Sequence, residues 1–329
     1  MPAGLTKHAD KPTQSLNRRL AKESKEFSFS AATDAVELSH ELPSMTKLTF
    51  ESGRNRNAAL RPTIVSLTFD DGTADQYVVR GMLAQNSLKA TFYVNSNKIG
   101  RTSSFLTWDE LSDLAADGNE VGGHTPDHVD LTKLRTAEAT RQVYEGRQAL
   151  ISRGFPATSF AYPYGARTAK VESIVRQCGY QSARRAWGLS PVGSMPSDSN
   201  AVVAETIPPR NVWAIRAAGV NLAHTLSDLQ GAVTGAENAG GGWVVLVFHN
   251  ISDGRSRNGA SVSASILSAF LDWLASRSAV ETHVRTMSDV VADGARSPLA
   301  LVAPPQKRGG NAEEAPAGLW RRMRTAFTG

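Results

Sequence analysis

The sequence predicts an α/β protein built around a parallel sheet. From residue 61 onward, short apolar runs alternate with stretches of helical periodicity, the pattern of repeated strand–helix–strand units. Two polar motifs, Asp70-Asp71-Gly72 and His124 to His128, each follow directly after one of the apolar runs. In barrels and open α/β sheets, functional groups gather at the carboxyl ends of the strands. Both observations therefore predict a catalytic α/β domain.

The elements of this domain can be placed from their apolar patterns and boundary residues. A capping box formed by Thr107 and Glu110 begins one helix, and the turn at Asp117-Gly118-Asn119 ends it. A strand-like segment at 179–183 leads into a loose stretch at 184–209. The other strands are expected at 64–69, 90–94, 120–123, 159–162, 243–248 and 283–286, and the helices at 75–86, 108–116, 137–153, 169–177, 225–239 and 263–277.

The two polar motifs together contain the ligands of a metal site. One aspartate with His124 and His128 makes a three-ligand set that leaves coordination positions for water and substrate. The second aspartate is then free to act as a base on that water. Either motif alone would be weak evidence, because Asp-Asp-Gly is a common turn and two histidines four residues apart often bind nothing. Their shared position at strand ends favours the metal site of a hydrolase.

Four motifs carry a resemblance to a known family. Residues 68–72 (Thr-Phe-Asp-Asp-Gly) and 124–128 (His-Thr-Pro-Asp-His) resemble the first two motifs of the polysaccharide deacetylases, carbohydrate esterase family four with its NodB-homology domain. Residues 160–165 (Phe-Ala-Tyr-Pro-Tyr-Gly) resemble the third motif, and 246–249 (Leu-Val-Phe-His) the fifth. The resemblance covers about residues 61 to 294. It implies a distorted (β/α)7 barrel, a seven-stranded relative of the TIM barrel, that hydrolyses acetyl groups on glycans.

The resemblance also implies roles for individual residues. Asp71, His124 and His128 would hold a divalent metal, for which zinc suits the donor set and cobalt, nickel or manganese are alternatives. Asp70 would take the proton of the attacking water. The backbone N–H of Tyr164 would stabilise the oxyanion, and His249 would protonate the departing amine.

The chain departs from the family pattern in two places. Ala161 stands where the third motif commonly begins with an arginine that binds the catalytic base, and no copy of the fourth motif, with its aspartate, is recognisable. A subgroup with Ala-Tyr-Pro-Tyr-Gly in the third motif shares the first departure. Arg184 or Arg185 is a candidate for the missing guanidinium. Trp187 and Trp213 could stack on a sugar, although packing in the core is the favoured role.

The rest of the chain is expected to consist of two terminal extensions. The chain carries 36 Lys and Arg against 31 Asp and Glu, but residues 61–294 hold 21 basic and 22 acidic side chains, so the excess positive charge lies outside this segment. A partly disordered N-terminal extension is expected at 1–60 and a flexible basic tail at 295–329. A nearly neutral body argues against a specific nucleic-acid partner.

The predicted location follows from the absence of targeting signals. Residues 1–25 lack the apolar core of a secretory signal, and no run is long enough to span a membrane. A cytoplasmic protein is the default expectation, with a cell-envelope or extracellular location if the start is misassigned or trimmed. Cys178 is the only cysteine, which excludes an intrachain disulfide, and its apolar surroundings predict a buried thiol.

The predicted function is metal-dependent deacetylation of a glycan, at N-acetyl or O-acetyl groups. One alternative is a hydrolase of small non-peptide amides, including acetylated small molecules. Another is a glycan-binding module whose altered motifs have cost it catalysis. A third, a regulator that binds polyanions through its basic ends, would show a steep salt dependence of binding.

Overall fold

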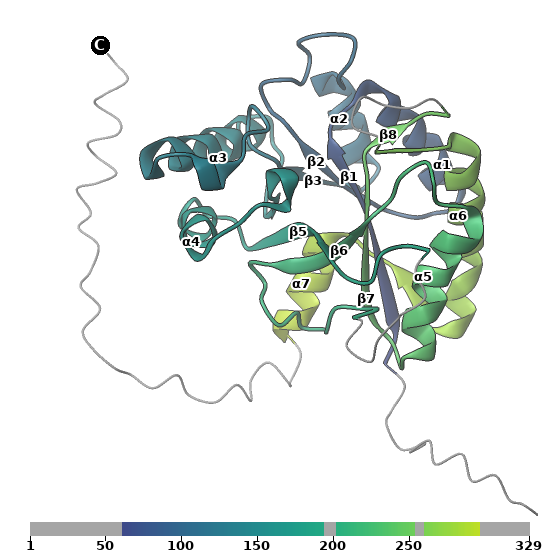
Figure 1. Cartoon of the computed structure of the whole chain (residues 1–329). Coiled ribbons are helices and arrows are strands. Elements are labelled where there is room, and N and C mark those ends of the chain that lie inside the picture. The colour runs from purple at the N-terminus through teal and green to yellow at the C-terminus, as the bar shows by residue number, and fades with distance from the viewer. Residues whose placement is uncertain (1–60, 194–201, 254–259, 297–329) are drawn as a thin grey trace, which may run out of the picture. The chain divides into compact units, whose positions relative to one another are not determined.

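The computed structural model describes residues 61–193, 202–253 and 260–296, which form an α/β domain (Figure 1). The predicted extension at 1–60 and all of the predicted tail except residues 295 and 296 lie outside the described residues. The predicted domain boundaries therefore stay predictions. Among the described helices, none is long and apolar enough to cross a membrane.

Seven parallel strands close into a barrel, as the sequence predicted. Neighbouring strands pair in chain order from β1 to β7, and β1 pairs again with β7 to close the ring. An eighth strand, β10 (Thr282–Val284), pairs with the start of β1 outside the closed ring. The barrel strands are β1 Thr63–Asp71, β2 Thr91–Val94, β3 Glu120–Gly123, β4 Ser159–Ala161, β5 Ser182–Gly188, β6 Ile215–Gly219 and β7 Gly242–Phe248.

Helices surround the barrel, with α1, α5 and α6 on one side and α3 and α4 on the other (Figure 1). The capping box at Thr107 and Glu110 is present at the start of α2, and Thr225 and Asp228 form a second one at α5. The helices are α1 Val79–Gln85, α2 Trp108–Ala116, α3 Thr136–Ile151, α4 Ala169–Gln177, α5 Leu226–Asn238, α6 Ala264–Ser276 and α7 Met287–Arg296; 3-10 turns lie at η1 Ala74–Val78, η2 Leu131–Lys133, η3 Pro163–Gly165 and η4 Arg277–Val280, and β8 Asn250–Ile251 pairs with β9 Ser261–Val262.

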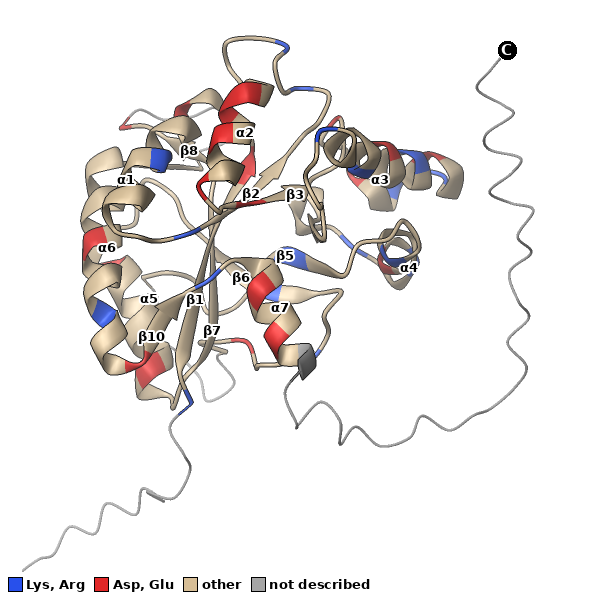
Figure 2. Cartoon of the chain, turned by 180° about the vertical axis from the view of Figure 1, so that it is seen from behind, with Lys and Arg blue, Asp and Glu red and all other residues tan. Residues whose placement is uncertain are grey.

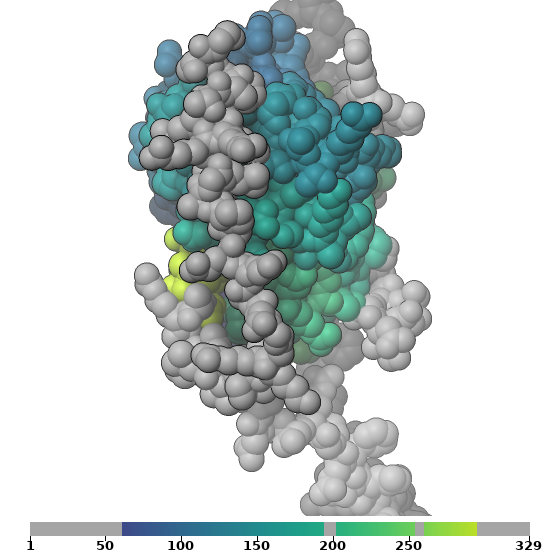
Figure 3. All heavy atoms as spheres, turned by 90° about the vertical axis from the view of Figure 1, so that its left-hand side faces the viewer, coloured from purple at the N-terminus to yellow at the C-terminus, as the bar shows by residue number. Residues whose placement is uncertain are grey.

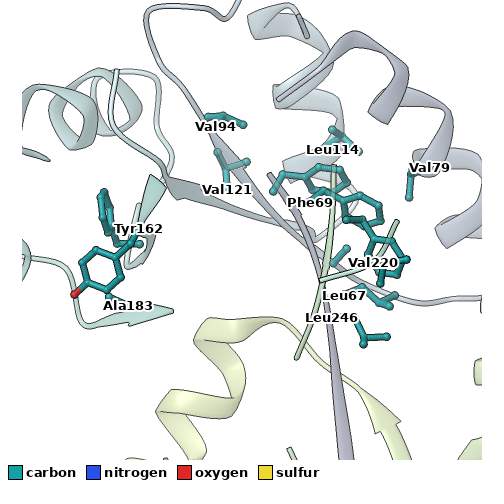
Figure 4. Packing of buried hydrophobic residues seen from close by; sticks show 14 of the residues in the cluster. Leu67, Phe69, Val79, Val94, Leu114, Val121, Tyr162, Ala183, Val220 and Leu246 are labelled. Carbon is teal, nitrogen blue, oxygen red and sulfur yellow. The ribbon is translucent and has the colours of Figure 1, made fainter. Parts of the chain in front are cut away.

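The strands have two buried faces because side chains alternate between the barrel interior and the surrounding helices. Between barrel and helices, Phe69 of β1 stacks on Phe92 of β2 at 5.0 Å and on Phe248 of β7 at 5.2 Å between ring centroids. Figure 4 shows Phe69 among Leu67, Val79 and other residues of this layer. The opposite face of each strand fills the barrel, where Trp243 of β7 and Tyr93 of β2 belong to a separate apolar cluster.

The structure corrects the predicted loose stretch at 184–209. Strand β5 extends to Gly188, so Arg184 and Arg185 lie within a strand and not after one. Strand β6 and helix α7 were not predicted at all. In β6 the sequence Ile-Arg-Ala-Ala-Gly has only one β-branched residue, so its strand signal is weak.

Candidate metal centre and active site

The carboxyl end of β1 turns sharply at the first motif. Asp71 has a φ of 76° and Gly72 a φ of 70°, both in the left-handed region. A Cβ on Gly72 would lie 2.8 Å from Ile99 Cδ1, the flexible end of that side chain, so the positive φ is the main reason for glycine at this turn. Because of the turn, the Asp71 carboxylate faces the two histidines of the second motif although Asp70 and Asp71 are adjacent.

The second motif is held in place at the end of β3. Thr125 and His128 also have positive φ, and the Thr125 hydroxyl accepts a hydrogen bond from the His128 N–H at 3.0 Å. The Asn95 side chain donates to the carbonyls of His124 at 2.7 Å and Thr125 at 3.3 Å. These local bonds fix a loop that would otherwise be strained. Asn95 was not identified from the sequence, since a buried asparagine after a strand has no distinctive pattern.

Asp71, His124 and His128 come together as the sequence predicted. One ligand atom from each lies within 4.8 Å of the other two. The Asp71 Oδ1 atom is 3.2 Å from His128 Nε2 and 3.6 Å from His124 Nε2. Buried Asp71 Oδ1 has no hydrogen-bond partner among the described residues. A buried oxygen without a partner is costly unless something else binds it.

The histidine protonation states fit a bound cation. The His124 Nδ1 atom donates to the carbonyl of Ala161 at 2.8 Å, because a carbonyl can only accept, and this leaves the Nε2 lone pair directed at the site. Burial lowers the pKa of His124 to about 3 and also lowers the pKa of His128. The negative charge of Asp71 raises both pKa values but does not outweigh burial. Two neutral imidazoles and a carboxylate form a donor set that fits a divalent metal such as zinc.

Asp70 lies beside this cluster and is paired with an arginine inside the barrel. The Asp70 side chain points inward from β1, and Nη2 of Arg184 from β5 donates to its Oδ1. Both residues are buried, with Arg184 0% and Asp70 3% exposed. The Arg184 guanidinium lies over the ring of Tyr93, with Cζ 4.7 Å from the centroid, and Nη1 donates to the Arg185 carbonyl at 3.2 Å. Arg184, and not Arg185, therefore makes the contact with the candidate base for which the sequence offered both residues.

His249 and Tyr164 lie at the edge of the same site. His249 directly follows β7, and its buried Nδ1 has no hydrogen-bond partner among the described residues. Gln76, which the sequence did not single out, donates to the carbonyls of both Asp70 and His249 and so links the ends of β1 and β7. Tyr164 has a φ of 57°, and its exposed ring meets the His128 ring edge-on at 4.6 Å.

The two tryptophans differ from the prediction that both pack in the core. Trp187 is 49% exposed, on the outer part of β5. Trp213 is partly buried against the main core, and its carbonyl accepts a hydrogen bond from the Tyr162 hydroxyl at 2.9 Å. Only Trp213 therefore matches the favoured interpretation.

The fold is a closed barrel whose strand ends carry three residues able to hold a metal ion, and comparison with known proteins shows which proteins the chain resembles. Residues 57–183 match the family model for polysaccharide deacetylase. Over this segment the chain resembles the polysaccharide deacetylases, in agreement with the family that the motifs predicted.

The chain is similar to several known deacetylases. A chitin deacetylase of Colletotrichum lindemuthianum is 35% identical over 91 residues, which are 27% of this chain and 36% of the relative. The peptidoglycan-N-acetylglucosamine deacetylase PgdA of Listeria monocytogenes is 33% identical over 105 residues, 31% of this chain and 22% of the relative. The matched segments thus span less than half of these relatives.

A solved family 4 carbohydrate esterase from Streptomyces lividans, in complex with acetate, is 19% identical. The alignment covers 68% of this chain and 92% of that one, with a TM-score of 0.45. The barrel of this chain is established by its own strand pairing.

Proposed function

We propose that this protein is a metal-dependent hydrolase that removes acetyl groups from a glycan, most directly N-acetyl groups from amino sugars. The observation that carries the proposal is the convergence of the Asp71, His124 and His128 cluster with the buried Asp70–Arg184 pair, at the strand ends of a polysaccharide deacetylase domain. Binding of a glycan alone would require neither a base nor a guanidinium to hold it.

Asp71, His124 and His128 would hold the divalent cation, with zinc the best match and cobalt, nickel or manganese as alternatives. When bound, this cation supplies Lewis acidity, which makes water a nucleophile near neutral pH. The Ala161 carbonyl orients the His124 ring for this purpose, through the bond to Nδ1.

The protein residues would then move the protons. Asp70 accepts a proton from water as the oxygen attacks the acyl carbon; Arg184 binds Oδ1, which leaves Oδ2 to receive that proton. The backbone N–H of Tyr164 donates to the oxygen on which negative charge develops. His249 gives a proton to the amine nitrogen as the C–N bond breaks, and the products are acetate and a free amino group.

The test is acetate release from a panel of N-acetylglucosamine oligomers, peptidoglycan, acetylated xylan and small N-acyl amides. Protein would be stripped of metal, reloaded with zinc or cobalt, and compared with Asp70→Asn. Asp272→Asn removes an exposed carboxylate from α6 and serves as the matched control. We expect release that needs metal, is lost in Asp70→Asn by a factor of about 10²–10⁴ and is kept in Asp272→Asn.

The responding substrate would separate the alternatives. Release from small amides alone would favour the small-molecule hydrolase. Binding of glycans without release from any substrate, by protein shown to contain metal, would favour the binding module.

A further inference from the structure

Strand β5 presents two arginines to opposite sides of the barrel wall. Arg184 points into the barrel, where it binds Asp70, whereas Arg185 and Trp187 lie together on the other face, with Arg185 Cζ 5.7 Å from the Trp187 ring centroid. Figure 2 shows the basic segment of β5 in blue. Arg184 is paired with Asp70, whereas Arg185 has no function in the proposed mechanism.

Arg185 and Trp187 line a cavity of about 360 Å³ next to the candidate active site. Its other walls come from Thr132 and from the segment Gly165 to Thr168. Figure 3 views the domain from the side on which α3 and α4 lie. Tyr164, whose ring contacts His128, directly precedes Gly165, so the cavity adjoins the metal-ligand cluster.

The aromatic side of the cavity depends on a glycine. A Cβ on Gly165 would lie 2.7 Å from Trp187 Cζ3 and 2.8 Å from the Ala186 nitrogen. The Trp187 ring therefore packs directly on the backbone of the third motif while half of its surface stays exposed. An exposed ring held in this way is suited to stack on the apolar face of a sugar.

The charges around the cavity are not balanced. Arg167 pairs with Glu172, and Arg216 pairs with Glu205 through both carboxylate oxygens at 2.7 and 2.9 Å. Arg185 has no carboxylate within ion-pair distance among the described residues, and its buried Nε lacks an acceptor there. Burial, followed by the nearby charges of Arg167 and Arg216, lowers the pKa of Arg185, although an arginine stays protonated near pH 7. The Arg185 guanidinium lies over the Trp187 ring, with Cζ 5.7 Å from the centroid, but no carboxylate among the described residues balances its charge, which favours an anion in the adjoining space.

We propose that this cavity, the Arg185 subsite, binds the carboxylate of an acidic sugar unit next to the unit that carries the acetyl group. The proposal rests on the proposed function and names its substrate class: a glycan in which amino sugars alternate with carboxylate-bearing sugars. One guanidinium without a carboxylate partner matches one planar carboxylate through two parallel N–H···O bonds. Trp187 stacks on the same sugar unit, and the size of the cavity is in the range of small-ligand sites.

The test measures binding separately from catalysis. Calorimetric titration of metal-loaded Asp70→Asn would compare a hexasaccharide of alternating N-acetylglucosamine and glucuronate with the same hexasaccharide after reduction of its carboxyl groups. We expect the acidic form to bind at least about tenfold more tightly, the range of one charge-assisted contact. Adding Arg185→Gln should remove this preference and leave the affinity for the reduced form unchanged.

Three further variants separate the roles of charge, shape and ring stacking. Arg176→Gln removes an exposed charge from α4 and should keep the preference. Arg185→Lys keeps the positive charge but lacks the planar guanidinium, so it should keep part of the preference for the acidic hexasaccharide. Trp187→Ala should weaken binding of both hexasaccharides to a similar extent. Melting curves of every variant would show that each is folded.

Several results would overturn the subsite. These are equal affinity for the acidic and reduced forms, an equal loss for both forms in Arg185→Gln, or an equal effect of Arg176→Gln. Acetate release by the protein with Asp70 intact, measured on the acidic hexasaccharide and on N-acetylglucosamine hexamers, reports on the proposed function independently. Release without an acidic preference would reject only the subsite, whereas an acidic preference in binding without any release would reject the catalytic proposal.

Discussion

Arg184 of β5 reaches across the barrel interior and binds Asp70 at the end of β1, 114 residues earlier in the chain. In the third motif of the family, such an arginine commonly stands at the position of Ala161. The alanine side chain here cannot bind Asp70, and the Ala161 carbonyl accepts a hydrogen bond from His124. β5 is the neighbour of β4, so the guanidinium enters from one strand further along the sheet. The same contact between a guanidinium and the candidate base is thus made from a different strand.

We expect Arg184→Ala to impair both stability and turnover. Removing one partner of a buried ion pair leaves Asp70 without its counter-charge and costs about 3–5 kcal/mol. Misplacement of the base would lower kcat by roughly 10²-fold. Urea unfolding and kcat on N-acetylglucosamine oligomers would measure the two effects. Arg216→Gln, which breaks the Arg216–Glu205 pair, should reduce stability but spare kcat of the folded protein. Full turnover in Arg184→Ala would remove Arg184 from the site.

Metal binding should stabilise the folded protein through the three proposed ligands. A cation at 100 times its Kd adds about 2.7 kcal/mol, which for a domain of this size corresponds to a Tm increase of about 5–10 °C. Differential scanning fluorimetry of stripped protein with added zinc would show this increase, and a chelator would reverse it. His128→Gln should abolish the increase, whereas His283→Gln, at an exposed histidine of β10, should retain it. An unchanged response in His128→Gln would exclude this cluster as the binding site.

Gly123 and Tyr180 should be coupled in stability. A Cβ on Gly123 would lie 1.9 Å from the Tyr180 hydroxyl and 2.7 Å from Cζ. Gly123→Ala is therefore expected to destabilise by about 1–3 kcal/mol or more. Tyr180→Phe removes a buried hydroxyl that has no partner among the described residues, so it should cost little alone and relieve part of the clash.

A double-mutant cycle by urea unfolding would measure this coupling, which we expect to reach about 1 kcal/mol. Gly81→Ala is the control, since nothing lies within 4 Å of its Cβ position in α1. It should be neutral or slightly stabilising. Additive effects of Gly123→Ala and Tyr180→Phe would contradict a direct contact between these two positions.

Cys178 should be unreactive in the native protein. Burial raises the pKa of its thiol to about 11, and Sγ lies 3.9 Å from the Thr140 carbonyl. The thiolate is the reactive form, and roughly one thiol in a thousand would be ionised at pH 8, against about a quarter for an unperturbed cysteine. Native labelling by iodoacetamide should therefore be slow, rise with pH beyond 9 and become fast in urea. Rapid labelling of native protein at pH 8, absent in Cys178→Ser, would show that the thiol is accessible.

The sequence predicted the ligand cluster because the relevant geometry follows from topology. Parallel strands end at one rim of a barrel, so Asp71 after β1 and His124 after β3 had to approach each other. The choice between Arg184 and Arg185 could not be made in the same way. Side chains alternate between the two faces of a strand, so the choice depends on which residues of β5 point into the barrel. A shift of one residue would exchange Arg184 and Arg185 between the two faces. The exposure of Trp187 likewise depends on its contact with Gly165, which is distant in the sequence.

Strand β1 has one edge that two strands share. β7 pairs along Thr63 to Phe69, so β10, paired at Thr63–Val65, and β2, paired at Thr68–Asp71, lie along the other edge. During synthesis the first of the described strands to emerge is thus among the last to be completed, because its partner in β10 follows more than 200 residues later. Until then the backbone groups at Thr63–Val65 are an open edge that can pair with another chain. A nascent or truncated chain that lacks β10 would carry this aggregation hazard even where every active-site residue is already present.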